Sequence, residues 1–247
     1  MKPKDEIFEF PVLITGAGSG IGRAIANRLL ADGVSVIAWD KDPELLREPF
    51  SDEEKSTPEI FRYVVDVSDS ASVRETMAKI TVKNPRISGL VNNAAIVGIT
   101  HTESEWDEIL SVNLNGYRNT VESTVNHLIP DSAIVQISSL SAHFGGAGMA
   151  AYSASKAAVE ACTRVLAVEL AVRKIRVNSV CPGWIATESN KPDLADPQFI
   201  SYMARCPMSR AGNPEEVAHV VAFLLSSESG YINGQVITVD GGWSISM

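Results

Sequence analysis

The chain has 247 residues, of which 45% are hydrophobic and 21% charged, and its formal net charge at pH 7 is -9. This length and composition suit one α/β domain with a full core, and the negative charge disfavours nonspecific binding to nucleic acid or anionic membranes. The apolar stretches are too short to span a bilayer, and no secretory signal follows Met1–Glu6. Three scattered cysteines, Cys162, Cys181 and Cys206, lack metal-ligand spacing and indicate reduced thiols, so we expect a cytoplasmic protein without a metal site.

Short apolar runs alternate with helical stretches along the whole chain. The runs expected to form strands lie at about 11–15, 34–40, 60–66, 89–93, 133–138, 176–181 and 236–239. Such alternation predicts a parallel sheet covered by helices on both faces. The handedness rule then gives a doubly wound, Rossmann-type α/β sheet of about seven strands in a single domain over residues 1–247, with ligands at the carboxyl ends of the strands.

The first strand leads into a glycine-rich turn, Thr15-Gly16-Ala17-Gly18-Ser19-Gly20-Ile21-Gly22, and then into a stretch of helical periodicity that ends at Asp32-Gly33. Strand, glycine turn and helix form the context in which such glycines bind a dinucleotide. The glycines permit close backbone approach, and the helix N-terminus offers free N–H groups and a positive dipole end to a pyrophosphate. The expected cofactor contacts from this turn are Gly16, Ser19, Gly20, Ile21 and Gly22.

The second strand ends at Asp40, close to the ~20-residue spacing of the acid that binds the adenosine ribose. A carboxylate there accepts hydrogen bonds from both ribose hydroxyls and repels a 2′-phosphate. Ser19 stands where a basic residue would otherwise meet that phosphate, whereas Lys41 offers a cation if Asp40 moves away. The sequence therefore favours NAD over NADP.

Tyr152 and Lys156 are four residues apart in Tyr152-Ser153-Ala154-Ser155-Lys156, so on a helix they share one face. An adjacent cation stabilises a phenolate and lowers the pKa of tyrosine from its usual ~10. The phenol then becomes a proton-transfer group suited to reactions at an alcohol carbon. By itself the pair also fits an ordinary exposed helix, and the glycine-rich turn upstream is what favours a chemical role.

Together, Thr15-Gly16-x-x-x-Gly20-x-Gly22 and Tyr152-x-x-x-Lys156 resemble the short-chain dehydrogenase/reductase family, and the resemblance covers almost the whole chain. Further motifs follow in the family's order: Asp66-Val67, Asn92-Asn93-Ala94-Ala95, Asn113, Ser139, Pro182-Gly183-Trp184-Ile185-Ala186-Thr187, Asn233-Gly234-Gln235 and Val239-Asp240-Gly241-Gly242. Ala95 stands where the family has glycine, which slightly narrows the backbone freedom there.

The resemblance implies a catalytic set of Asn113, Ser139, Tyr152 and Lys156. Tyr152 would exchange a proton with the substrate, Ser139 would hold the substrate oxygen, and Lys156 would tune Tyr152 and hold the nicotinamide ribose. Asn113 would hold a water that links Lys156 to solvent. Ser138 is a competing candidate beside Ser139, while Ser139 and Asn113 also fit structural roles as a cap and a kink. The remaining implied cofactor contacts are Asp66 (which also fits a strand-end cap), Val67, Asn93, Ala94, Pro182, Ile185 and Thr187, together with Tyr152 and Lys156.

These residues lead us to expect an oxidoreductase that transfers a hydride between NAD(H) and a secondary alcohol or its ketone. The expected pocket residues are His143, Phe144, Met149 and Trp184, and because three of the four are large and apolar they favour a compact hydrophobic or alicyclic substrate. His143 fits a polar wall better than a second acid. The alternatives are an NADP-dependent 3-oxoacyl reductase of the same family, against which Asp40 argues, and a non-catalytic dinucleotide sensor. Enoyl reductases of similar fold place the tyrosine six residues before the lysine.

Two proline-containing segments interrupt the alternation. Residues 42–59 predict a surface excursion with one short helix, and the resemblance makes residues 188–210 a lid over the substrate, before a helix that starts at Asn213-Pro214-Glu215-Glu216. Relatives are commonly tetramers that pair helices like those at 104–126 and 152–171. Trp243, Ile245 and Met247 form an apolar tail that suits an interface. We therefore expect a homo-oligomer, a tetramer rather than a dimer, with a small-molecule substrate and no nucleic-acid or membrane partner.

Overall fold

The computed structural model describes residues 9–50, 58–83, 85–190 and 197–246. Seven strands form one sheet in the order β3-β2-β1-β4-β5-β6-β7, and every pairing in it is parallel. The strands are β1 Val12–Thr15, β2 Val36–Asp40, β3 Ile60–Val64, β4 Ile87–Asn92, β5 Leu128–Ile137, β6 Arg176–Pro182 and β7 Val236–Val239. The strand order reverses between β1 and β4, which places a ligand crevice at their carboxyl ends. The predicted seven-stranded, doubly wound fold is confirmed.

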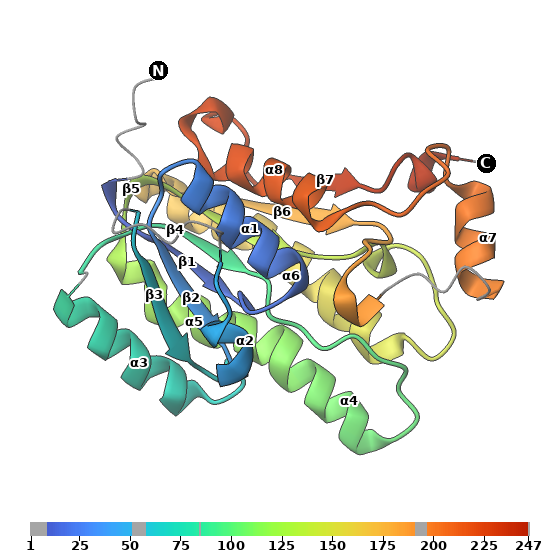
Figure 1. The fold of residues 1–247 in the computed structure, drawn as a ribbon, viewed down its shortest axis with the longest axis horizontal. Coiled ribbons are helices and arrows are strands. Elements are labelled where there is room, and N and C mark those ends of the chain that lie inside the picture. The colour runs from blue at the N-terminus through green and yellow to red at the C-terminus, as the bar shows by residue number, and fades with distance from the viewer. Residues whose placement is uncertain (1–8, 51–57, 84, 191–196, 247) are drawn as a thin grey trace.

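Helices cover both faces of the sheet (Figure 1). They are α1 Gly20–Ala31, α2 Pro43–Arg47, α3 Ser70–Lys83, α4 Glu103–Leu110, α5 Tyr117–Thr124, α6 Ala150–Leu170, α7 Pro197–Arg205 and α8 Pro214–Leu225. Side chains of β1 alternate between two cores: Val12 and Ile14 pack with α1 and α8, whereas Leu13 packs with residues of α3, α5 and α6. This alternation follows from the two-residue period of a strand, and it leaves only the strand ends free to carry polar site residues.

Two predicted local signals are confirmed. The short helix expected after Asp40 is α2, whose N-cap Asp42 accepts a hydrogen bond from Glu44 N; residues 51–57 of that segment lie outside the described part. At the start of α8, Pro214 takes the first turn and Asn213 N donates to the Glu216 carboxylate at 2.8 Å. Because this bond satisfies a backbone donor that the helix leaves unpaired, it fixes where α8 begins.

Two elements differ from expectation. The strand expected at 133–138 begins at Leu128, and its register against β4 shifts between Ile87 and Gly89; Pro130 and Asp131, which has φ 66°, disguise the strand in the sequence. The helix expected over 104–126 is divided, because a π-helical turn, Ser111–Gly116, separates α4 from α5. Such turns are rare and are frequently found at functional sites.

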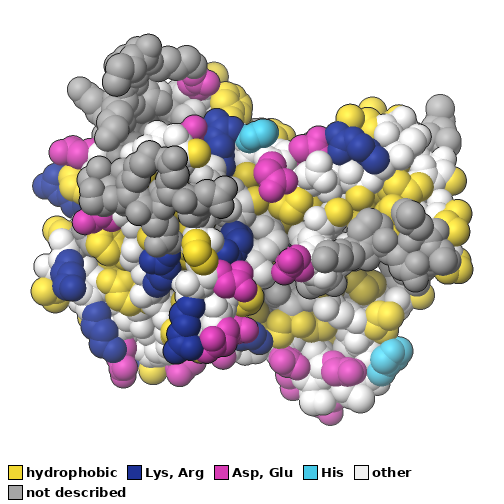
Figure 2. All heavy atoms as spheres, viewed as in Figure 1, with side chains coloured by type: hydrophobic (Ala, Val, Ile, Leu, Met, Phe, Trp, Pro, Cys, Tyr) yellow, Lys and Arg dark blue, Asp and Glu magenta, His cyan; other side chains and the backbone are white. Residues whose placement is uncertain are grey.

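The surface carries charges of both signs. In the face shown in Figure 2, Lys and Arg side chains lie among Asp and Glu, and hydrophobic side chains gather near the end that carries α7. Within the described ranges, no helix is long and apolar enough to cross a membrane.

Candidate active site

Ser139 and Tyr152 meet at the carboxyl end of the sheet. Ser139 follows β5, Tyr152 lies in the first turn of α6, and the two hydroxyl groups share a hydrogen bond. Lys156 lies one turn further along α6, where its Nζ donates to Ile137 O at 2.8 Å and stands 5.7 Å from the centre of the Tyr152 ring. Serine, tyrosine and lysine are therefore brought together as the sequence predicts.

Burial has the largest influence on the pKa of both Tyr152 and Lys156. Burial raises the pKa of the phenol above its usual value, and the hydrogen bond from Ser139 opposes this only in part. Burial also lowers the pKa of Lys156 to about 8. The lowered tyrosine pKa expected from the sequence combines a close cation with a charged cofactor, whereas within the chain itself desolvation disfavours both the phenolate and the ammonium.

The side chains of Ser138 and Ser139 make different contacts. Ser138 is buried, and its Oγ donates to the Glu160 carboxylate at 2.6 Å. Ser139 Oγ instead faces Tyr152 and accepts a bond from Ser141 N at 3.2 Å, which caps the short 3-10 turn that follows. The geometry therefore favours Ser139 over its neighbour as the group that meets a substrate.

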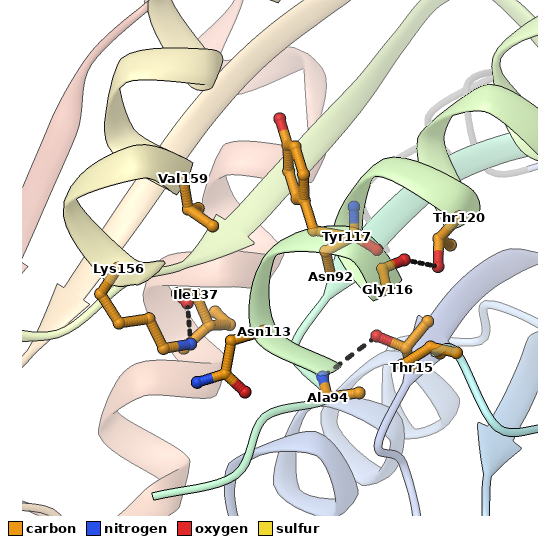
Figure 3. Close-up of a pocket in the computed structure, with 11 residues that line it drawn as sticks. Thr15, Asn92, Ala94, Asn113, Gly116, Tyr117, Thr120, Ile137, Lys156 and Val159 are labelled. Atoms are coloured by element: carbon orange, nitrogen blue, oxygen red, sulfur yellow. Dashed lines mark hydrogen bonds between the residues drawn. The ribbon is translucent and has the colours of Figure 1, made fainter. Parts of the chain in front are cut away.

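Asn113 sits in the π-helical turn with its amide fully engaged. Its Oδ1 accepts from Ile96 N at 2.7 Å, and its Nδ2 donates to Ile96 O at 2.9 Å and to Ser155 Oγ at 3.2 Å. The side chain thus fastens the segment after β4 to α6. Beside it lies a cavity of about 10 Å³ that Lys156 and Asn113 help to line (Figure 3), which is room for about one water molecule.

The glycine turn is shaped for close backbone approach. Gly16 has φ 62°, and a Cβ added at Gly22 would lie 2.0 Å from Gly16 O. Asn93, directly after β4, holds the turn from the other side, because its Nδ2 donates to Thr15 O at 3.1 Å and Gly16 O at 3.0 Å. Ala94 N donates to Thr15 Oγ1 at 3.1 Å (Figure 3). Glycine is thus required at both positions, and without side chains there the backbone at the start of α1 can approach a ligand closely. This arrangement suits the pyrophosphate of a dinucleotide.

Asp40 is joined to this turn. Its Oδ2 accepts from Gly18 N at 2.9 Å, and its Oδ1 accepts from Asp42 N at 3.0 Å. Ser19 is exposed and makes no capping bond with its side chain, and Lys41 is exposed as well. The carboxylate is thus fixed at the end of β2, beside the helix start that would hold the phosphates.

The other predicted cofactor residues lie around the same edge. Asp66 is exposed after β3 and accepts from Ser68 N at 2.9 Å, which also makes it a cap, while Val67 is buried. Thr187 faces the glycine turn, since its Cγ2 would lie 3.2 Å from a Cβ at Gly20. The remaining predicted residues are Pro182, the last residue of β6, Ile185, buried before Thr187, and Ile21, partly buried in α1. Asp66 and Val67 thus follow β3, and Pro182, Ile185 and Thr187 lie at or beyond the carboxyl end of β6.

Aromatic rings cluster around two of the predicted pocket residues, Phe144 and Trp184. The Trp243 ring stacks on Tyr202 with centroids 5.3 Å apart and meets the Phe144 edge at 5.0 Å. Trp184 packs against Phe199 at 5.3 Å and Tyr202 at 5.7 Å. Of the predicted pocket residues, Phe144 and Trp184 belong to this aromatic cluster, Met149 packs with the group around Tyr152, and His143 bonds to Glu160.

Sequence reasoning missed three contributors to this site, namely Glu160, Tyr202 and Trp243. Glu160 was detectable as an acid one helical turn after Lys156. Trp243 packs against residues of its own chain, with the Arg205 guanidinium 4.2 Å above its ring, and remains partly exposed. Ile245 is 84% exposed, and Met247 lies outside the described residues.

Comparison with known proteins identifies the family. A family profile described as enoyl-(acyl carrier protein) reductase matches residues 16–244. A short-chain dehydrogenase/reductase described as a glucose/ribitol dehydrogenase from Brucella melitensis has 34% identity and a TM-score of 0.88, with 96% of this chain and 98% of that chain covered. This chain belongs to the short-chain dehydrogenase/reductase family. As a family member it is an oxidoreductase that uses a nicotinamide cofactor.

Two other family members resemble the chain closely. The 3-oxoacyl-[acyl-carrier-protein] reductase of Thermotoga maritima is 40% identical over 236 residues, which covers 93% of this chain and 96% of the relative. The solved structure of levodione reductase has 32% identity and a TM-score of 0.88, with 96% of this chain and 98% of that chain covered. These relatives differ in substrate, so the family alone does not fix what this short-chain dehydrogenase/reductase acts on.

Proposed function

We propose that the protein transfers a hydride between NAD(H) and a secondary alcohol or its ketone, with Tyr152 as the general acid and base. The observation that carries the proposal is the buried set at the start of α6. Ser139 and Tyr152 share a hydrogen bond, and Lys156 lies one turn away with its ammonium fixed on Ile137 O. These groups stand beside a glycine turn that fits a dinucleotide.

In alcohol oxidation, the Tyr152 phenolate takes the proton of the substrate hydroxyl, and in ketone reduction the phenol returns it. Ser139 donates a hydrogen bond to the substrate oxygen and stabilises the charge that develops there. The Lys156 ammonium stands 5.7 Å from the centre of the Tyr152 ring, where a positive charge favours the phenolate. The nicotinamide, when bound, supplies or accepts the hydride. Asn113 keeps the segment after β4 in place and borders the one-water cavity next to Lys156.

Asp40 supports NAD as the cofactor. The carboxylate is anchored by Gly18 N and Asp42 N, so its charge stays at the ribose end of the glycine turn. A 2′-phosphate placed there would meet a like charge, whereas ribose hydroxyls would meet an acceptor. Ser19 offers no charge to compensate.

The aromatic cluster supports a compact hydrophobic or alicyclic carbonyl. Phe144, Trp184 and Tyr202 come from three segments. Trp243 packs against Phe144 and Tyr202, and Tyr202 packs against Trp184. Burial of a flat apolar substrate against such rings contributes favourably to the free energy of binding. We propose α7 as the main part of a substrate lid, since it carries Tyr202.

A second candidate is an NADP-dependent 3-oxoacyl reductase. The 40% identity to the Thermotoga maritima reductase favours it, and Asp40 argues against it. A non-catalytic dinucleotide sensor is a third, but such a protein would have no need of Tyr152, Ser139 and Lys156 together.

Absorbance of NADH and NADPH during turnover distinguishes these candidates. Cyclic, aliphatic and aromatic secondary alcohols and ketones, together with a 3-oxoacyl thioester, would be offered with each cofactor. Turnover of a cyclic ketone with NADH, lost in Tyr152→Phe, is the expected result. Turnover of the thioester with NADPH alone would replace the proposal by the acyl reductase. Tight NADH binding without turnover of any substrate would favour the sensor.

We also propose a homo-oligomer, with a tetramer favoured over a dimer. Val165, Val168 and Val172, at and just beyond the end of α6, are 56%, 79% and 88% exposed, which suits an interface on this helix. Light scattering coupled to size-exclusion chromatography would give the mass, and a monomer would contradict this assignment.

A further inference from the structure

Three side chains with metal-binding atoms converge behind Ser139. His143 lies in the loop after β5, Glu160 lies on α6 one turn after Lys156, and Cys181 lies on β6. One ring nitrogen, one carboxylate oxygen and one sulfur from these residues all lie within 4.8 Å of one another. His143 Nε2 is already 3.0 Å from one Glu160 oxygen and 3.1 Å from the other.

Imidazole, carboxylate and thiolate are the ligands that zinc-class ions prefer. In a tetrahedral site with zinc–nitrogen and zinc–sulfur bonds of ordinary length, neighbouring ligand atoms stand about 3.3–3.7 Å apart. His143 and Glu160, at 3.0 Å, are slightly closer than that spacing, and because all three ligand atoms lie within 4.8 Å of one another, the Cys181 sulfur would move toward this pair when an ion binds.

The polar surroundings resemble those of a metal site. Ser138 Oγ donates to Glu160 at 2.6 Å, and Thr238 forms a hydrogen bond with the Cys181 thiol. Hydrogen bonds of this kind orient metal ligands in known sites. Glu160 and Cys181 are buried, whereas the His143 side chain is 47% exposed, so an ion from solvent would meet the histidine first.

The charges around Cys181 are mainly negative. The carboxylates of Glu160 and Asp240 and the ammonium of Lys156 are the charged groups that act on its thiol. Two carboxylates near one position attract a divalent cation.

We propose that His143, Glu160 and Cys181 bind a transition-metal ion of the zinc class, with water as the fourth ligand, and that the bound ion inhibits turnover. We expect inhibition because the ligands lie next to the catalytic residues. The His143 loop also carries Ser139 and Phe144, and Cys181 directly precedes Pro182 of the cofactor segment. An ion that joins these segments holds the loop still. Binding itself does not depend on the proposed reaction, and only the inhibition rests on it.

Cobalt(II) is the probe for binding, because a thiolate ligand gives it a charge-transfer band that nitrogen and oxygen ligands do not. The full-length protein would be titrated with Co²⁺ and the ion then displaced with Zn²⁺. The chain has three cysteines, so Cys162→Ala and Cys206→Ala are matched controls for Cys181→Ala. The expected result is one sulfur-bound ion per chain in wild type and in both controls.

Cys181→Ala should lose the charge-transfer band, and Glu160→Gln should weaken binding at least ~10-fold, the lower end of what loss of an outer hydrogen bond alone costs a metal site. Thermal unfolding of each variant shows that it is folded. No band in wild type, or a band that survives in Cys181→Ala, overturns the site.

The inhibition is tested separately, once a substrate is known. Zn²⁺ should lower the turnover of wild type and of Cys162→Ala at concentrations where Mg²⁺ does nothing, and Cys181→Ala should be at least ~10-fold less sensitive. Zinc binding without a difference between wild type and Cys181→Ala in inhibition would overturn the inhibitory role while leaving the metal site.

Discussion

The glycine turn and the catalytic residues lie at the same edge of the sheet, but their polar groups are paired to different degrees. Around the turn, both oxygens of Asp40 accept backbone N–H groups, and Arg23 Nε donates to Gly18 O at 2.9 Å. At the start of α6, the Lys156 ammonium is buried with a single acceptor among the described residues, and burial shifts the pKa of both Lys156 and Tyr152 against their charged forms.

The polar groups on the cofactor side are thus already paired within the protein, and we call this side the framework. On the catalytic side, a buried charge lowers the stability of the fold. Changes to the framework should therefore weaken both folding and cofactor binding. Changes to the catalytic groups should remove turnover and leave the fold as stable as before, or more stable.

The largest expected effect is on turnover. Tyr152→Phe removes the proton-transfer group and should lower kcat by about 10²–10⁴-fold, while the Kd for NADH changes by less than about twofold. Steady-state kinetics and fluorescence titration of NADH measure the two quantities. Turnover that persists in the variant would remove Tyr152 from its assigned role.

Lys156→Met sharpens the contrast in stability. With a pKa of about 8 in the folded protein, against 10.5 ordinarily, the buried ammonium destabilises the fold at pH 7 on the order of 3 kcal/mol. Loss of the bond to Ile137 O destabilises the variant by about 1 kcal/mol. The free energy of unfolding of Lys156→Met should therefore be about 2 kcal/mol higher than that of wild type, and the variant should be inactive.

The sign of the pH dependence is a further check on Lys156. Because the folded pKa lies below the unfolded one, the unfolded chain binds more protons between pH 8 and 10.5, and wild type regains stability across that range. The advantage of Lys156→Met over wild type should therefore vanish by pH 10.5 in urea unfolding. Lys79→Met, at an exposed position of α3, is the control and should show no such trend. An advantage that does not change with pH would contradict a buried charge.

Gly22→Ala tests the framework. Its Cβ would lie 2.0 Å from Gly16 O, so the turn must move, which should cost about 1–3 kcal/mol of unfolding free energy and abolish NADH binding. Gly98→Ala is the matched control, because nothing lies within 4 Å of a Cβ added there. If the Gly22 variant bound NADH like wild type, the turn would not be the phosphate cradle.

Asp40→Asn is expected to have the smallest effect. The amide keeps one acceptor for Gly18 N but loses the charge, so the preference for NAD over NADP should fall by about tenfold, equivalent to ~1.4 kcal/mol. The ratio of kcat/KM for the two cofactors measures it, with Asp42→Asn, at the exposed cap of α2, as control. An unchanged ratio would mean that another residue selects the cofactor.

The parts of the fold that depend on local patterns were predictable from the sequence. The strands, the glycine turn and the four-residue spacing of Tyr152 and Lys156 rest on periodicity, and each expected strand is present, although β3 ends two residues early and β5 begins five residues early. The aromatic cluster was not predictable, because Phe144, Tyr202 and Trp243 come from segments that only the tertiary fold brings together. The burial that raises the pKa of Tyr152 was not predictable either, since burial does not show in a sequence motif.

Because Asn113 lies in the π-helical turn Ser111–Gly116, its position depends on the number of residues in that turn. A π-helical turn contains one residue more than an α-helical turn, so its geometry depends on the length of the chain there as well as on its side chains. Deleting one residue from this turn would let α4 and α5 fuse into a continuous α-helix and rotate one against the other by about 100°. Asn113 would then leave Ile96 and Ser155, although every functional side chain would still be present in the sequence. Insertions and deletions, more than substitutions, are thus the changes to which this part of the site is most sensitive.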